Sequence, residues 1–114
     1  MRWFKLEGVC PSDKPFLRKL KVNGKSLCVV NYNHEIYAVA AFCPHAGADL
    51  SGGWCHDGNL VCPFHRYSYD IKTGKGAPGQ NDFIATYPVK INKDGIYVGM
   101  YSLVEKIKLA FGSQ

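Results

Sequence analysis

The sequence has no hydrophobic run long enough to cross a membrane. Its longest apolar stretch is residues 37–43, whereas a membrane-spanning helix needs about 20 apolar residues. Residues 1–7 also lack the apolar region of a secretory signal peptide. These absences argue against a membrane-anchored or secreted protein, and we expect a cytoplasmic location with no membrane partner.

Basic residues are missing from the middle of the chain. None of the 14 Lys and Arg residues falls between Ser26 and His65, a stretch that holds Glu35, Asp49 and Asp57. The net charge of +5 therefore comes from the flanking segments. No base-stacking motif or basic helix accompanies it, so we expect no nucleic-acid partner. An acidic docking partner fits the positive charge better.

Cysteines are few and odd in number, which argues against a disulfide framework. Of the 5 cysteines, two belong to the metal motifs described below. Cys10, Cys28 and Cys55 remain, as suits free thiols in a reducing compartment. Cys28 lies in an apolar strand pattern and is expected in the core. Cys55 and His56 are adjacent, and adjacent side chains of an extended chain point to opposite faces, so the two cannot bind one metal centre.

Two short motifs each pair one Cys with one His. They are Cys43-x-His45 and Cys62-x-x-His65, with sixteen residues between them. Two thiolates and two imidazoles are the ligand set of a Rieske centre, a [2Fe–2S] cluster in which two His replace two Cys on one iron. Structural zinc is the rival metal. Its usual sites leave two to four residues between paired Cys and three to five between paired His, and Cys-x-His is shorter than either.

The mixed ligand set changes the charge of the cluster. A ferric core has two formal positive charges, which two thiolates cancel, so reduction of a site with neutral His ligands creates a single negative charge. A site with four Cys would begin with two negative charges and end with three. The Rieske potential is therefore higher, about −150 to +300 mV against about −400 mV for plant-type ferredoxins. The motifs thus predict a one-electron carrier.

The chain resembles the Rieske ferredoxin family, whose motif is Cys-x-His, fifteen to seventeen residues, then Cys-x-x-His. The resemblance spans about 3–100 and includes Gly47, Gly52-Gly53-Trp54, Asp57-Gly58, Tyr69-Asp70, and Pro78 in a Gly-rich third loop. It implies an all-β fold, an antiparallel β-sandwich with a cluster-binding subdomain. It also implies that Cys43 and Cys62 bind one iron, and that His45 and His65 bind the outer, more exposed iron.

Differences from the Rieske subunits of cytochrome bc complexes concern the potential. Ala48 and Phe64 replace two Cys that form a loop-bridging disulfide there, and Tyr67 replaces a Ser that donates to a cluster sulfide. Because such donors stabilise the reduced state, losing one predicts a low potential for a Rieske centre. Tyr69 occupies the position of a second donor. Arg66, where many relatives have Gly, is either a cation that acts on the cluster or a partner, or a solvated loop residue.

The length of 114 residues predicts one domain over residues 1–114, and the turn sequences predict antiparallel strands within it. Asn23-Gly24, Asp57-Gly58 and Asp94-Gly95 are hairpin turns, and the strands expected around them are 17–22, 25–32, 36–41, 54–55, 60–61, 86–91 and 95–100. The cluster-binding loops fall at about 42–70, at the tips of hairpins. A C-terminal extension at about 101–114 has apolar residues at the spacing of a short helix packed on the domain.

We interpret the chain as an electron-transfer protein with one [2Fe–2S] cluster and no catalytic residue, not as an enzyme. By resemblance, it shuttles electrons from a flavin-dependent reductase to a terminal oxygenase or other oxidoreductase. The alternative is a small redox subunit stably bound to a larger enzyme, such as a nitrite reductase. A zinc-binding interaction module remains only if the metal assignment is wrong.

Overall fold

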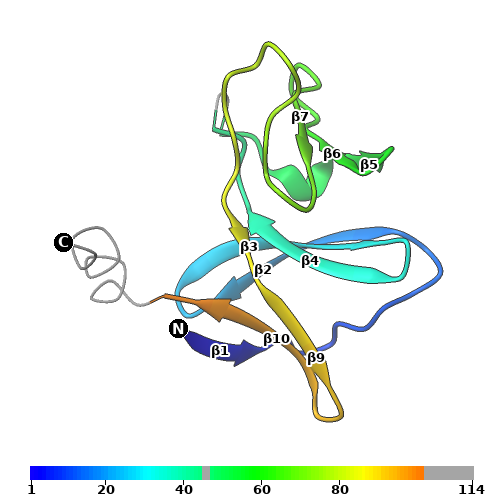
Figure 1. Ribbon diagram of the computed structural model, residues 1–114, viewed down its shortest axis with the longest axis vertical. Coiled ribbons are helices and arrows are strands. Elements are labelled where there is room, and N and C mark those ends of the chain that lie inside the picture. Colours follow the sequence, from blue (N-terminus) through cyan, green and yellow to red (C-terminus); the bar gives the residue numbers. More distant parts are fainter. Residues whose placement is uncertain (45–46, 102–114) are drawn as a thin grey trace.

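The computed structural model describes residues 1–44 and 47–101. Within these ranges the chain forms ten β-strands, the short 3-10 helix η1 (Leu50–Gly52) and no α-helix (Figure 1). The strands are β1 (Arg2–Lys5), β2 (Phe16–Val22), β3 (Lys25–Tyr32), β4 (Glu35–Ala40), β5 (Trp54–His56), β6 (Asn59–Val61), β7 (Ser68–Asp70), β8 (Thr86–Tyr87), β9 (Val89–Asn92) and β10 (Gly95–Met100). The predicted all-β class is confirmed. The C-terminal helix expected after residue 101 lies outside the described residues.

All the strand pairs are antiparallel, and they form three sheets in the orders β1-β10-β9, β2-β3-β4-β8 and β5-β6-β7. The first two sheets form the base and share one core, which consists of Leu6, Val9, Val22, Leu27, Val29, Ile36, Ala38, Ile96, Val98 and Met100. This is the sandwich that the sequence predicted.

Strand β3 is buried on both faces, because it separates the two hydrophobic cores. Leu27 and Val29 contribute to the core of the base, whereas Cys28 and Val30 contribute to a second core under the third sheet. Successive side chains of a strand point to opposite faces, so an uninterrupted apolar run is what this position requires. Cys28 is fully buried, as its sequence context predicted.

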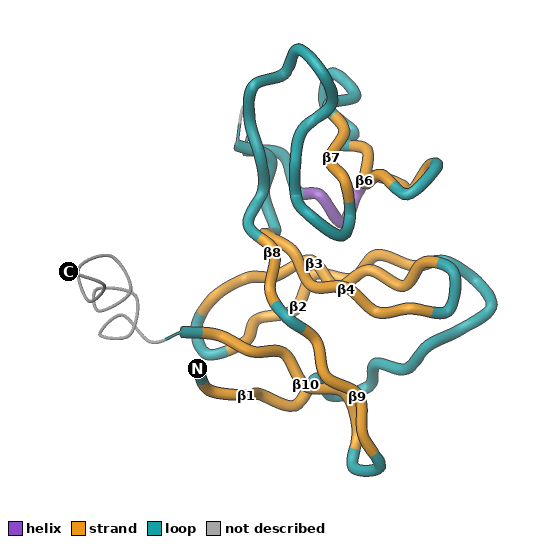
Figure 2. The backbone as a smooth tube through the Cα atoms, in the orientation of Figure 1, coloured by secondary structure: helices purple, strands orange, loops and turns teal. Residues whose placement is uncertain are grey.

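The sheet β5-β6-β7 and its loops form the cluster-binding subdomain, which stands above the base in Figure 1. Figure 2 shows this part of the molecule mainly as loops. The chain leaves the base through β4 and returns through β8, and these two strands pair with each other at Ala38–Tyr87 and Val39–Thr86. The Ala40 amide also donates to the Ala85 carbonyl at 2.9 Å. The outgoing and returning strands are therefore hydrogen-bonded to each other where the subdomain meets the base, which restricts its movement.

The hairpin turns agree with the sequence, but one expected strand is divided. Asn23 and Gly24 adopt φ values of 51° and 79°, which match the left-handed turn that Asn-Gly favours. The single strand expected over 86–91 breaks at Pro88 into β8 and β9, which belong to different sheets. Proline has no amide proton to donate to a sheet. Strands β1 and β7 were not predicted, since both are short.

Candidate metal centre

The first motif forms a tight loop whose cysteine points inward. The Cys43 amide donates to the Ala48 carbonyl at 2.9 Å, and the Gly47 amide donates to the Cys43 carbonyl at 2.8 Å. A single antiparallel bridge between Phe42 and Asp49 closes the loop, so the hairpin expected at this loop consists of one bridged residue pair. Gly47 has φ 66°, a conformation that costs glycine little. Cys43 is 1% exposed, whereas His45 lies outside the described residues.

The second motif lies at a hairpin tip, as predicted, although the second strand of that hairpin, β7, was not predicted. The Cys62 amide donates to the Tyr67 carbonyl at 2.6 Å, which closes the loop. His65 and Arg66 have φ values of 60° and 56°, and this left-handed region is uncommon for residues with a side chain. Two successive left-handed residues turn the chain so that Cys62 is buried while His65 is exposed.

The two cysteines of the motifs meet inside the subdomain. Both belong to the same buried cluster, and the Cys43 side chain lies close enough to raise the pKa of Cys62, in addition to the larger effect of burial. The Phe64 amide nitrogen lies 3.4 Å from Cys62 Sγ and donates to it. Two adjacent buried sulfurs, one of which accepts a backbone hydrogen bond, fit a pair of thiolate ligands to one iron.

The His65 imidazole stands at the surface of the second loop. Its ring packs edge-on against Phe64, with ring centroids 4.4 Å apart, and more distantly against Tyr67 at 6.4 Å. Phe64 is itself 52% exposed. Sulfur inside and imidazole outside is the arrangement that the family resemblance implies for the two irons.

The described residues test only part of the four-ligand set. Among residues 1–44 and 47–101, no three side chains of His, Cys, Asp or Glu gather closely enough to hold a metal ion. Since His45 is outside these ranges, the assignment of Cys43, His45, Cys62 and His65 as one ligand set stays a prediction.

Tyr69 connects the first cysteine to the third loop. Its side chain is fully buried, and its hydroxyl lies 3.3 Å from Cys43 Sγ and donates to Asp82 Oδ2 at 2.7 Å. Burial raises the pKa of Tyr69, and the neighbouring Cys43 and Asp82 raise it further, so the hydroxyl keeps its proton at neutral pH. The family resemblance places Tyr69 at the position of a sulfur donor, whereas no motif or spacing in the sequence marks Asp82.

The third loop, which contains Pro78, is hydrogen-bonded to β7 just after the second motif. The Ala77 amide donates to the Ser68 carbonyl at 3.0 Å, and the Ser68 amide donates to Gln80 Oε1 at 2.9 Å. Gly76 is required by close packing, because a Cβ there would lie 2.2 Å from Asp82 Oδ1. The loop is therefore held to β7 by hydrogen bonds at two of its residues.

The remaining cysteines are placed as expected. All five cysteines of the sequence lie within the described residues, and none forms a disulfide. Cys55 packs against the second core, whereas the His56 side chain next to it is 74% exposed and lies 3.2 Å from Asp57. The two point in different directions, which agrees with their exclusion as joint ligands.

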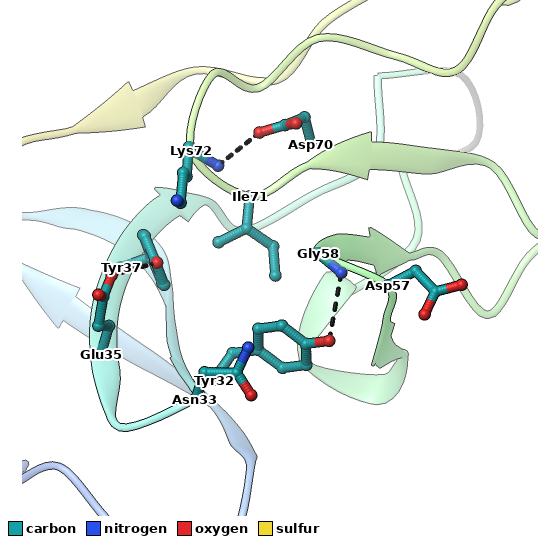
Figure 3. A pocket seen from close by; sticks show the side chains of 9 residues that line it. All are labelled: Tyr32, Asn33, Glu35, Tyr37, Asp57, Gly58, Asp70, Ile71 and Lys72. Carbon is teal, nitrogen blue, oxygen red and sulfur yellow. Dashed lines mark hydrogen bonds between the residues drawn. The ribbon is translucent and has the colours of Figure 1, made fainter.

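One cavity between the base and the subdomain is lined by no described residue of the two motifs. It has a volume of about 410 Å³ and opens between the turn after β3 and the turn between β5 and β6 (Figure 3). Tyr32 accepts a hydrogen bond from the Gly58 amide across it at 3.2 Å. Its three carboxylates all have partners: Glu35 accepts from the Tyr37 hydroxyl, Asp70 accepts from two backbone amides, and Asp57 lies 3.2 Å from His56 Nε2. The cavity lies between the base and the subdomain, and none of the predicted cluster-binding residues that the structure describes lines it.

The fold and the two Cys-His loops define an all-β iron–sulfur protein. The chain belongs to the Rieske [2Fe-2S] domain family, whose model matches residues 3–88. It therefore carries one [2Fe–2S] cluster of the Rieske type. In the part of the chain that the structure describes, no helix is long and apolar enough to cross a membrane.

Comparisons with individual proteins agree with this family. The chain is 37% identical over 99 residues to the ferredoxin component of naphthalene 1,2-dioxygenase/salicylate 5-hydroxylase systems from Ralstonia sp., covering 83% of this chain and 94% of that protein. It resembles a chain of a solved complex of reduced oxygenase and oxidized ferredoxin in carbazole 1,9a-dioxygenase, with a TM-score of 0.72, 25% identity, and coverage of 85% and 92%. A putative NADH-dependent nitrite reductase small subunit from Mycobacterium tuberculosis shares the fold, with a TM-score of 0.75, 17% identity, and coverage of 90% and 97%.

Proposed function

We propose that Cys43, His45, Cys62 and His65 hold the cluster, and that the chain carries single electrons from a flavin-dependent reductase to a terminal oxygenase. The observation that supports the ligand set most directly is that Cys43 and Cys62 meet in one buried core, while His65, three residues after Cys62, is exposed. The cluster supplies a site that gains and loses one electron. The protein holds its thiolates in a dry core and one imidazole at the surface.

The surface around His65 is suited to electron transfer between proteins. Phe64, whose ring packs against His65, is 52% exposed, and Arg66, next to His65 in the sequence, is also exposed. A partner that covers such an apolar side chain would exclude water and bring its own redox group close to the imidazole edge. We therefore propose that electrons enter and leave through this face.

The choice of partner rests on named relatives. The Ralstonia protein is a ferredoxin component of oxygenase systems and aligns over nearly its whole length. The stably bound subunit of a nitrite reductase is the alternative, and the likeness to such a subunit is at 17% identity, which indicates the fold alone. Sequence identity therefore favours the ferredoxin of an oxygenase system.

An electron-transfer assay separates these functions. The purified holoprotein, in catalytic amount, should link NADH oxidation by a flavoprotein reductase of an oxygenase system to reduction of the matching oxygenase, and it should elute alone in gel filtration. Stoichiometric co-purification with a larger enzyme, together with no turnover as a mobile carrier, would favour the bound-subunit alternative. Stoichiometric zinc in a colourless protein would contradict both.

We also propose one domain over residues 1–114 and a cytoplasmic location. Strand β1 pairs with β10, from Arg2–Met100 to Lys5–Tyr97, so the two ends of the described chain complete one sheet. The thiols of Cys10, Cys28 and Cys55 form no disulfide, which suits a reducing compartment.

A further inference from the structure

The Tyr69 hydroxyl lies between two groups that can accept its proton. Asp82 Oδ2 is 2.7 Å from the hydroxyl oxygen, and Cys43 Sγ is 3.3 Å from it. A phenol has one proton, so it can form a strong hydrogen bond to only one of the two at a time. Which group receives it matters, because one is a carboxylate and the other is, by the proposed function, a ligand of the cluster.

The geometry favours the carboxylate. A separation of 2.7 Å is typical of a hydroxyl that donates to an ionised oxygen, and such charge-assisted bonds are about twice as strong as neutral ones. In the metal-free protein, Cys43 can itself donate to the Tyr69 oxygen. A thiolate bound to iron has no proton, and it then faces an oxygen whose own proton points to Asp82.

Asp82 is held in place by its own loop. Gln80 Nε2 donates to Asp82 Oδ1 at 2.9 Å, and the Gly76 amide donates to the Asp82 carbonyl at 2.9 Å. The side chain is partly buried, and Tyr69 is fully buried. The carboxylate is therefore an ordered partner of Tyr69 and not a mobile surface charge.

We propose that Asp82 is a positioning residue that directs the Tyr69 proton away from Cys43 Sγ and thereby lowers the reduction potential of the cluster. Two effects act in the same direction. A hydrogen-bond donor to a cluster sulfur stabilises the reduced state, so withholding it disfavours reduction. The negative charge of Asp82 also opposes the negative charge that reduction adds.

A double-mutant cycle on the holoprotein tests this inference through the potential, not through turnover. Asp82→Ala should raise the potential, because the Tyr69 hydroxyl can then turn to Cys43 Sγ. Tyr69→Phe should change the potential little in the wild type but should lower it in the Asp82→Ala background. We expect a coupling of about tenfold in the equilibrium constant for reduction, equivalent to about 59 mV for one electron.

Two further variants make the measurement specific. Asp82→Asn removes the charge while keeping the size of the side chain, and it should also raise the potential, so the test holds if the Ala variant folds poorly. Asp57→Asn is the matched control, because its carboxylate is in the same subdomain but exposed, and Asn tolerates its φ of 49°. It should leave the potential almost unchanged.

A vibrational readout gives independent support. The iron–thiolate stretching bands should respond to hydrogen–deuterium exchange more strongly in Asp82→Ala than in the wild type, because the hydroxyl then donates to the sulfur. The inference would be wrong if both Asp82 variants had the wild-type potential, or if Tyr69→Phe lowered the potential equally in both backgrounds. Either result would leave the proposed function intact. A wild-type chain that binds no cluster would overturn the proposed function, and this inference with it.

Discussion

Lys19 and Asp49 join the base of the molecule to its cluster-binding subdomain. The Lys19 Nζ of β2 lies 2.8 Å from Asp49 Oδ2, just after the first Cys loop. The other carboxylate oxygen caps η1 by accepting from the Ser51 amide at 2.9 Å and from its hydroxyl at 2.6 Å. One side chain therefore holds both the salt bridge and the helix cap at the end of this loop.

Replacing Asp49 by Ala should lower the free energy of unfolding by roughly 1 kcal/mol, the usual cost of a lost cap. Lys19 first, and then Ser51, lower the pKa of Asp49 to about 2. A lowered pKa means that the contribution is complete above the ordinary value of about 4 and is lost as pH falls toward about 2. Urea unfolding should therefore give the same difference in unfolding free energy between wild type and Asp49→Ala at pH 7 and at pH 5.

Asp13→Ala is the control for this measurement, because the Asp13 side chain is 93% exposed. A difference for Asp49→Ala that shrinks from pH 7 to pH 5 would contradict the low pKa of Asp49.

The ligand set predicts the metal content of variants. The wild type should be red-brown, with about two iron and two acid-labile sulfide per chain. Cys62→Ala or His65→Ala should lose the cluster or most of it, whereas Cys10→Ala should keep it, since Cys10 is exposed and outside both motifs. Iron and sulfide analysis with visible absorption measures this, and full occupancy in His65→Ala would remove that residue from the set.

The potential should lie in the lower part of the Rieske range, roughly −150 to 0 mV. Ala48, Phe64 and Tyr67 occupy the positions of the disulfide and of the Ser donor of the higher-potential subunits. Tyr67→Ser should raise the potential if its hydroxyl reaches a sulfide, with Tyr67→Phe as a control that supplies no hydroxyl. Protein-film voltammetry decides, and a wild-type value near the top of the range would contradict the argument.

Thiol labelling should distinguish the cysteines outside the motifs. Burial, with a smaller effect of Asp49 and Cys55, raises the pKa of Cys28 to about 12, so almost no reactive thiolate is present at pH 8. Cys10 is exposed and should react with iodoacetamide first. Mass spectrometry of the folded and the urea-unfolded holoprotein gives the order of modification, and rapid labelling of Cys28 in the folded state would contradict its place in the core.

Arg66 should affect electron transfer through its charge. Its φ of 56° suits glycine, so Arg66→Gly should not lower the free energy of unfolding. If the cation attracts an acidic partner, the variant should transfer electrons more slowly at low salt and about normally at high salt, since exposed charges are screened over about 10 Å at 0.1 M. Arg66→Lys is the matched control that keeps the charge. Equal rates for wild type and Arg66→Gly at low salt would leave Arg66 as a solvated loop residue.

Local patterns were enough to predict much of the fold. The turns at Asn23-Gly24 and Asp57-Gly58 follow from the preference of these residues for left-handed backbone, and the strands beside them follow from apolar residues at strand spacing. The break at Pro88 was not predicted, although a proline inside an expected strand is a local signal for one; only the assignment of β8 and β9 to different sheets depends on the tertiary structure. Strands β1 and β7 are too short to show a periodicity of their own.

The type of metal centre can be read from the sequence, because the donor atoms and their spacing within each motif are local properties. The groups that surround those donors are known only from the folded structure. Asp82 contacts Tyr69 from thirteen residues away, and Lys19 of β2 contacts Asp49 in the loop before η1. Such contacts depend on how the third loop and β2 return to the subdomain, and no residue pattern near either partner encodes that return.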